Sequence, residues 1–264
     1  MNDADESLAI AVAMLAAAPF IGSFLGVLAL RLPANRAVAW SRSACDHCGH
    51  VLAPADLAPL LSYLFLGGRC RYCHAKIGRF ALAIECAALL VAAWATIQTS
   101  GWVIVASCIF GWILLLLAVI DWRVQLLPDV ITLPLLLAGL VAAAFLASDP
   151  FVNHLVGALA GFAAFAFIAF AYRVLRGRDG LGLGDAKLLA GIGAWISWTG
   201  LPAVVLWGSV LGLLFTLARG VAGHRLRLSD RLPFGAFLAA GGWLVWLYGP
   251  LDANFLHFFE IIPR

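Results

Sequence analysis

Two aspartates at the edges of long apolar runs are the first candidates for chemistry. Asp121 ends the apolar run 113–120, and Asp185 follows the stretch 182–184 and opens the next apolar run. Charged residues beside membrane-spanning segments are energetically expensive and often functional. Two carboxylates held close together tend to share one proton, so that one accepts a proton from water while the other donates a hydrogen bond to a peptide carbonyl. Asp121 and Asp185 are therefore predicted to be the catalytic pair of an aspartyl protease.

The glycines before Asp185 allow two interpretations. Gly182 and Gly184 let the backbone turn tightly and leave room for a substrate strand, which would make them supports of the catalytic residue. Alternatively, Asp185 is only the N-cap of the next helix and the glycines form a flexible linker. Asp129, which follows Pro128, is predicted to be a helix N-cap.

Four cysteines form a second candidate site. They make two CxxC pairs separated by 21 residues: Cys45, Cys48, Cys70 and Cys73. Each pair can place two sulfurs on one metal ion, and four thiolates are typical of structural zinc. The alternative is a pair of redox-active or unligated CxxC motifs. The surrounding loop is too small for a conventional core, so bound Zn²⁺ would supply much of its folding energy.

The elements that must position these residues are membrane helices. Of the 264 residues, 64% are hydrophobic and 12% are charged, whereas a soluble domain carries about 25% charged residues. The mean hydropathy is +0.99. These values exclude a soluble enzyme, a disordered chain and a secreted disulfide scaffold. The net charge of +3 is too small to suggest nucleic-acid binding, so the expected surroundings are a lipid bilayer and no nucleic acid.

The uncharged runs predict an all-α polytopic membrane protein with about eight transmembrane helices. A turn is expected at residues 99–101, and a break near residues 198–202 divides the longest of the later runs. Residues 1–30 form the first helix, 31–79 the four-cysteine loop, and 80–264 a multi-helix membrane domain carrying the aspartates. The apolar runs cover residues 8–30, 87–120, 130–148, 150–172, 188–218 and 232–251.

The basic residues predict the orientation of these helices. Residues 31–79 contain seven of the seventeen Lys and Arg residues, which places this loop in the cytoplasm. With the two expected breaks, most of the remaining basic residues fall on the same side. Both termini are then periplasmic, and both aspartates lie at the cytoplasmic ends of their helices.

Five motifs, in order along the chain, resemble those of the type 4 prepilin peptidase family. The resemblance covers almost the whole chain and implies a GxGD-type intramembrane aspartyl protease. The matching stretches are 19–25 in the first helix, 59–64 between the cysteine pairs, 121–134 around the first aspartate, 182–187 with the Gly-Leu-Gly-Asp-Ala-Lys sequence, and 232–239 with a Pro-Phe-Gly sequence.

The resemblance implies an activity and its partners. Such enzymes cleave the basic leader from type IV prepilins or pseudopilins at the cytoplasmic face of the bacterial inner membrane. They then methylate the new N-terminal residue with S-adenosylmethionine. Asp121 and Asp185 match the family's catalytic aspartates, and the four cysteines match the loop of its bifunctional members. The sequence identifies neither the S-adenosylmethionine-binding residues nor the oligomeric state.

Two other classes of protein remain as alternatives. A transporter would use the aspartates as ion sites and would place charges nearer helix centres. A scaffold of a secretion complex would act through the zinc loop without protease activity. For the peptidase, three further acidic residues are candidate contacts of the basic leader: Asp46, Asp56 and Asp179.

Overall fold

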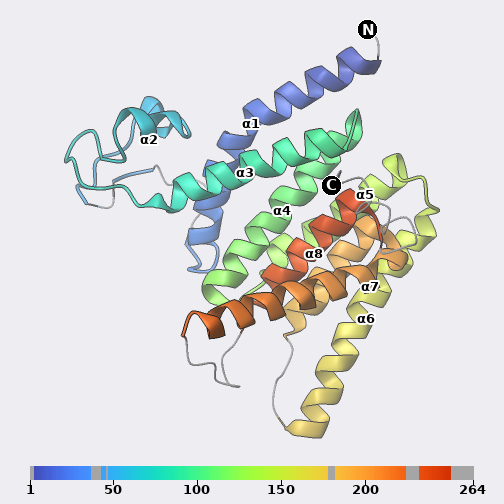
Figure 1. The fold of residues 1–264 in the computed structure, drawn as a ribbon. Helices are drawn as coiled ribbons and strands as arrows, with labels where there is room; N and C mark the ends of the chain where they lie inside the picture. Colours follow the sequence, from blue (N-terminus) through green and yellow to red (C-terminus); the bar gives the residue numbers. More distant parts are fainter. Residues whose placement is uncertain (1–2, 37–42, 46, 178–181, 224–231, 251–264) are drawn as a thin grey trace. The chain divides into compact units, whose positions relative to one another are not determined.

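The computed structural model describes residues 3–36, 43–45, 47–177, 182–223 and 232–250 (Figure 1). Within these ranges the secondary structure is helical, apart from two isolated antiparallel bridges. The chain divides into two compact units, Met1–Leu116 and Leu117–Arg264. The cysteines belong to the first unit and both aspartates to the second. The basic residues Arg178, Arg225, Arg227 and Arg231, which contributed to the predicted orientation, lie outside the described ranges.

The first unit pairs two long apolar helices. Helix α1 (Asp3–Arg31) packs along α3 (Arg79–Gln98), and the segment between them contains the 3₁₀ helix η1 (Pro54–Leu57) and the short helix α2 (Leu61–Phe65). The next helix, α4 (Trp102–Val124), begins directly after Gly101, which has a φ of +57°. The predicted turn at residues 99–101 is therefore confirmed.

A close contact between α1 and α3 depends on Gly22. A Cβ atom at this position would lie only 2.7 Å from the Cα of Glu85. Small residues at such points let membrane helices approach closely. Gly26, one turn further along α1, is less confined, because the nearest atom to its added Cβ would be 3.8 Å away.

We expect Gly22→Ala to separate α1 from α3, because the clash is with backbone atoms that cannot rotate away. Overpacking of this kind typically lowers stability by about 1–3 kcal/mol. The measurement is thermal unfolding of the purified protein in detergent, with Gly26→Ala as the matched control. Equal melting temperatures for the two variants would contradict the prediction.

The second unit is built around its longest helix. Helix α7 (Leu183–Val221) packs against α5 (Asp129–Leu146), α6 (Phe151–Arg176) and α8 (Phe234–Tyr248) (Figure 1). These contacts place the beginnings of α7 and α8 close to the end of α4, which carries Asp121. The site that follows is assembled from these helix ends.

Helix α7 is interrupted at one residue. Ser197 has φ +62° and ψ 176°, values that are outside the helical region and strained for a residue with a side chain. The hydroxyl groups of Ser197 and Thr199 lie 2.9 Å apart. Gly157 on α6 makes room for the interruption, since a Cβ there would lie 2.8 Å from the Ser197 carbonyl carbon. The break expected near residues 198–202 is present one residue before that range.

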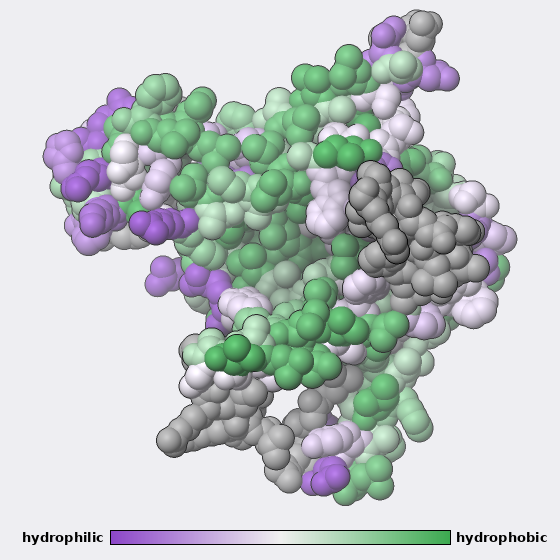
Figure 2. Space-filling view, viewed as in Figure 1, coloured by the Kyte–Doolittle hydropathy of each residue, from purple (hydrophilic) through white to green (hydrophobic). Residues whose placement is uncertain are grey.

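The described helices fit a membrane environment. Six of them are long and apolar enough to span a bilayer, and α8 is a shorter apolar helix. If the two halves of α7 are counted separately, the described residues contain eight apolar helical segments, as the sequence predicts. Large apolar side chains lie exposed along the helices, whereas many of the hydrophilic residues gather on the loop that follows α1 (Figure 2). The all-α membrane fold is thus confirmed.

Candidate functional site

The two aspartates lie at helix ends and are close enough to interact electrostatically. Asp121 is in the last turn of α4 and is only 5% exposed. Asp185 is the third residue of α7. The two carboxylates interact electrostatically, although 64 residues separate them in the sequence. The arrangement brings together the two residues that the sequence singled out.

The carboxylate of Asp121 is held by the beginning of α8. The backbone N–H of Ala236 donates a hydrogen bond of 2.9 Å to Oδ2 of Asp121, and the N–H of Gly235 is a second backbone donor. Unpaired N–H groups at a helix N-terminus bind anions readily. The stretch 232–239 entered the sequence analysis only through its resemblance to a family motif. In the structure it orients a candidate catalytic residue.

Asp185 is not a helix N-cap. The N-cap of α7 is Gly182, and Asp185 lies within the first helical turn. Its carboxylate accepts a hydrogen bond from the backbone of Gly182. Gly182 thus contacts the aspartate directly, in keeping with a supporting role. The space left by Gly184 is occupied by Leu127, whose Cβ would lie 3.1 Å from a Cβ added to the glycine.

Asp129 has a different role from the one predicted. The N-cap of α5 is Pro128, so Asp129 is the first helical residue and not the cap. Its two carboxylate oxygens lie 2.6 and 2.8 Å from Nζ of Lys187 on α7. The capping prediction was wrong because a partner 58 residues away cannot be read from local spacing.

The four cysteine sulfurs form one cluster. The Sγ atoms of Cys45, Cys48, Cys70 and Cys73 all lie within 4.8 Å of one another, and no disulfide joins them. Such a cluster could hold a single metal ion.

The two CxxC turns have the same hydrogen bonds. The N–H groups of Cys45 and Cys70 each donate to the carbonyl five residues later, at His50 and Ala75. An antiparallel bridge flanks each turn, between residues 44 and 51 and between residues 69 and 76. The backbone N–H groups of Cys48 and His47 lower the pKa of the Cys45 thiol to about 6. Although the backbone N–H of Ala75 acts to lower it, burial and the neighbouring sulfurs instead raise the pKa of the Cys73 thiol to about 12. A thiolate is the form that binds metal, and within the cluster the first CxxC turn favours this form at Cys45.

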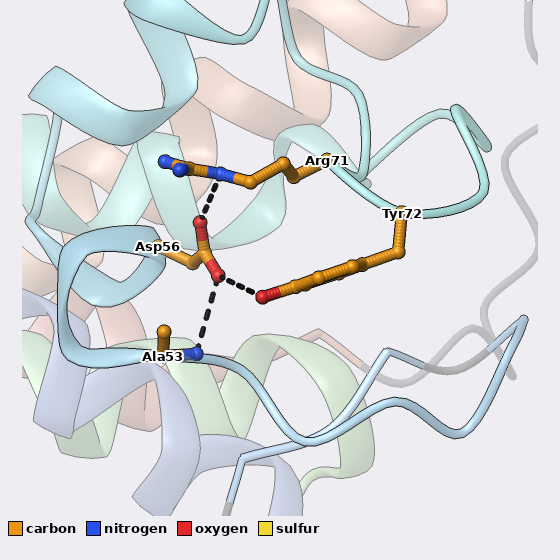
Figure 3. Close-up of polar contacts among 4 residues, drawn as sticks. All are labelled: Ala53, Asp56, Arg71 and Tyr72. Atoms are coloured by element: carbon orange, nitrogen blue, oxygen red, sulfur yellow. Dashed lines mark hydrogen bonds and ion pairs between the residues drawn. The ribbon is translucent and has the colours of Figure 1, made fainter.

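Asp56 fastens the second CxxC turn to η1 (Figure 3). Its side chain is 4% exposed, and Oδ1 lies 2.7 Å from Nε of Arg71. Oδ2 accepts hydrogen bonds from the Tyr72 hydroxyl at 3.4 Å and from the Ala53 N–H at 3.2 Å. Both carboxylate oxygens of Asp56 therefore bind groups within the loop, and neither is available to bind a basic leader. Asp46 and Asp179 lie outside the described residues.

A buried glutamate connects the loop to the first pair of helices. Glu85 on α3 is 6% exposed, and its Oε2 accepts a 2.8 Å hydrogen bond from the N–H of Leu60. Leu60 has a φ of +60°, a backbone conformation that is strained for leucine. The hydrogen bond therefore holds a strained turn in the middle of the loop.

Replacing Glu85 with Ala should release this turn. A hydrogen bond to a charged group contributes about 1.5–3 kcal/mol, so we expect faster cleavage within residues 43–79 during limited proteolysis. Glu85→Gln retains an acceptor oxygen and serves as the control. Identical cleavage of the alanine variant and the wild type would show that the bond does not hold the loop.

Comparison with known proteins agrees with this geometry. The sequence pattern described as "Bacterial Peptidase A24 N-terminal domain" matches residues 16–99, and that of the "Type IV leader peptidase family" matches residues 108–217. The chain belongs to the type IV leader peptidase family. The first matched range contains the four cysteines, and the second contains both aspartates.

Relatives of the chain in this family share one name, "Prepilin leader peptidase/N-methyltransferase". A protein of Burkholderia pseudomallei is 39% identical over 87% of this chain and 82% of its own length. One from Aeromonas salmonicida is 36% identical over 87% of both chains, and one from Pseudomonas aeruginosa is 34% identical over 93% of both. No solved structure was found to match.

The matched range of the type IV leader peptidase family stops before α8. It ends at residue 217, whereas the backbone donors to Asp121 come from Gly235 and Ala236. The site therefore extends beyond the part of the chain that the family pattern recognises.

Proposed function

We propose that this protein is a membrane aspartyl endopeptidase that removes the leader of type IV prepilins or pseudopilins and N-methylates the new N-terminal residue. The observation that carries the peptidase activity is the pairing of Asp121 and Asp185 at neighbouring helix ends. The shared name of the relatives supports both activities.

In this proposal the two carboxylates hydrolyse the peptide bond together. One aspartate, ionised, takes a proton from a water molecule, whose oxygen then attacks the scissile carbonyl carbon. The other aspartate, protonated, donates a hydrogen bond to the carbonyl oxygen. When the C–N bond breaks, the leaving nitrogen receives the proton that the first aspartate took from water and becomes the amino group of the mature pilin. Gly182 and the beginning of α8 hold the two carboxylates in place.

The four cysteines are proposed to hold a structural Zn²⁺ ion. A zinc–sulfur distance of ~2.3 Å in a tetrahedral site corresponds to sulfur–sulfur distances of about 3.8 Å. The Sγ atoms of Cys45 and Cys73 lie 3.8 Å apart. The cysteine loop, residues 31–79, would then be a zinc-stabilised element between the first membrane helix, residues 1–30, and the multi-helix domain, residues 80–264.

S-adenosylmethionine is the proposed methyl donor for the second activity. Its methyl group would pass to the α-amino nitrogen that cleavage exposes, so cleavage must precede methylation.

The bacterial inner membrane is the proposed location. The basic residues of the cysteine loop favour a cytoplasmic position for that loop, with both termini in the periplasm. A prepilin is itself a membrane helix with a charged leader, so its cleavage site lies at the same face as the two aspartates in this orientation.

A single reaction tests both activities. Membranes containing the protein are incubated with a prepilin and S-adenosylmethionine labelled in its methyl group. We expect a shortened pilin that carries the label on its N-terminal residue, and membranes without the protein give the background. Cleavage without label would overturn the methyltransferase assignment, and an intact prepilin would overturn the peptidase assignment.

A further inference from the structure

One apolar side chain lies between the two segments that hold the aspartates. Leu127 belongs to the short connection between α4 and α5. Its Cβ would be 3.1 Å from a Cβ built on Gly184, the residue before Asp185, and its Cδ1 would be 3.0 Å from a Cβ built on Gly235. Leu127 therefore packs against the beginnings of both α7 and α8, where only glycine leaves room for it.

The same two segments hold the two carboxylates. Gly235 is so close to Asp121 that an added Cβ would lie 3.0 Å from Oδ2 of the aspartate. Gly184 precedes Asp185 in the first turn of α7. Any movement of Leu127 would thus change how closely the beginnings of α7 and α8 approach each other, and with it the position of each carboxylate.

An ion pair holds the connection that carries Leu127. Asp129 follows Leu127 by two residues, and both of its carboxylate oxygens are within 2.8 Å of Nζ of Lys187. Lys187 in turn follows Asp185 by two residues on α7. The pair therefore fastens the beginning of α5 to the beginning of α7, beside the point where Leu127 is inserted. The Lys187 and Asp129 side chains are 37% and 58% exposed. The pair is therefore expected to fix the relative position of the two helix ends and to add little to stability.

We infer that Leu127 is a positioning residue that sets the separation of Asp121 and Asp185, and that the Asp129–Lys187 ion pair keeps it inserted. This inference rests on the proposed aspartate pair. Neither Leu127 nor the ion pair takes part in proton transfer. Their contribution is to hold the carboxylates where one water molecule and one peptide bond fit between them.

The first test shortens the inserted side chain. A displacement of reacting groups by about 1 Å can lower a rate about 100-fold. For Leu127→Ala we expect kcat for prepilin cleavage to fall about 10- to 100-fold while KM changes less than about threefold. Leu127→Met keeps most of the side-chain volume and should restore at least half of the wild-type kcat. A rise in KM with unchanged kcat would overturn the inference, because it would make Leu127 a substrate contact.

The second test exchanges the charges of Asp129 and Lys187. Unlike Leu127→Ala, it leaves no cavity among packed side chains. Asp129→Lys and Lys187→Asp should each lower kcat, and the double variant should recover most of it, since the opposite charges still meet. If the double variant is no better than either single one, the ion pair does not hold the site. Membrane abundance and melting temperature of every variant are measured in parallel, so that a loss of folding is recognised.

One control separates this inference from the proposed function. Asp121→Asn must be inactive in the same assay if the aspartates are catalytic. If Asp121→Asn still cleaves prepilin, the proposed function fails. If Asp121→Asn is inactive but both Leu127→Ala and the single charge variants keep wild-type kcat, the proposed function stands and the positioning inference fails.

Discussion

Replacing either Asp121 or Asp185 with alanine should abolish prepilin cleavage. The two carboxylates interact with each other and are held at helix ends by backbone hydrogen bonds, so each depends on the other for proton sharing. Loss of one member of a catalytic group typically lowers the rate by at least ~1000-fold. The measurement is the initial rate of leader removal from a prepilin in membranes, with the variants matched for abundance.

A matched control makes this result interpretable. Asp149 is an exposed acidic residue between α5 and α6, and Asp149→Ala should cleave at the wild-type rate. If Asp121→Ala and Asp185→Ala both retained activity, the protein would not be an aspartyl protease of this kind. The scaffold alternative would then account better for the chain, because a scaffold tolerates substitution of either aspartate.

Removing the metal should unfold the cysteine loop. The wild-type protein should contain about one Zn²⁺ per chain, and Cys70→Ser should contain almost none, since four thiolates complete a structural site. Cys70 is 3% exposed and belongs to the cluster. Zinc binding supplies about 10–16 kcal/mol to small domains of this type, so the variant loop should be cleaved rapidly by protease and methyl transfer should fall.

Two controls accompany the zinc experiment. Cys86 is an exposed cysteine on α3, outside the cluster, and Cys86→Ser should retain both zinc and loop stability. Leader cleavage by Cys70→Ser should fall much less than methyl transfer, since the aspartates belong to the other unit of the chain. A Cys70→Ser protein with a full complement of zinc would refute the four-cysteine site.

The helices and the cysteine cluster could be predicted from the sequence, because each depends on a local or regularly spaced pattern of residues. The apolar runs predict the helices, and the CxxC spacing predicts the sulfur cluster. Asp121 and Asp185 were singled out as candidates because charges at the edges of apolar runs are rare. Even the break in α7 was expected, since the basic residues could not otherwise fall on one side of the membrane.

The supports of the site were not predictable in the same way. The contact between Leu127 and the two glycines joins three segments that are distant in the sequence, and nothing in an isolated leucine marks it as an inserted side chain. Asp129 was wrongly predicted to be a local helix cap, because its partner Lys187 is distant in the sequence. Lys187 directly follows the Gly-Leu-Gly-Asp-Ala stretch, and this proximity was the available hint.

The interruption of α7 at Ser197 has a consequence for the supply of water. The half of α7 that carries Asp185 covers residues 183–196. At ~1.5 Å per residue, a helix of this length extends only about 21 Å. The hydrocarbon layer of a bilayer is about 30 Å thick, so this half-helix cannot match it unless the lipids thin around it. Lipid thinning lowers the barrier for polar groups to enter. With the lipids thinned in this way, Asp185 at the beginning of the half-helix would stay at the boundary with water, and the reactant that hydrolysis consumes would reach it without crossing hydrocarbon.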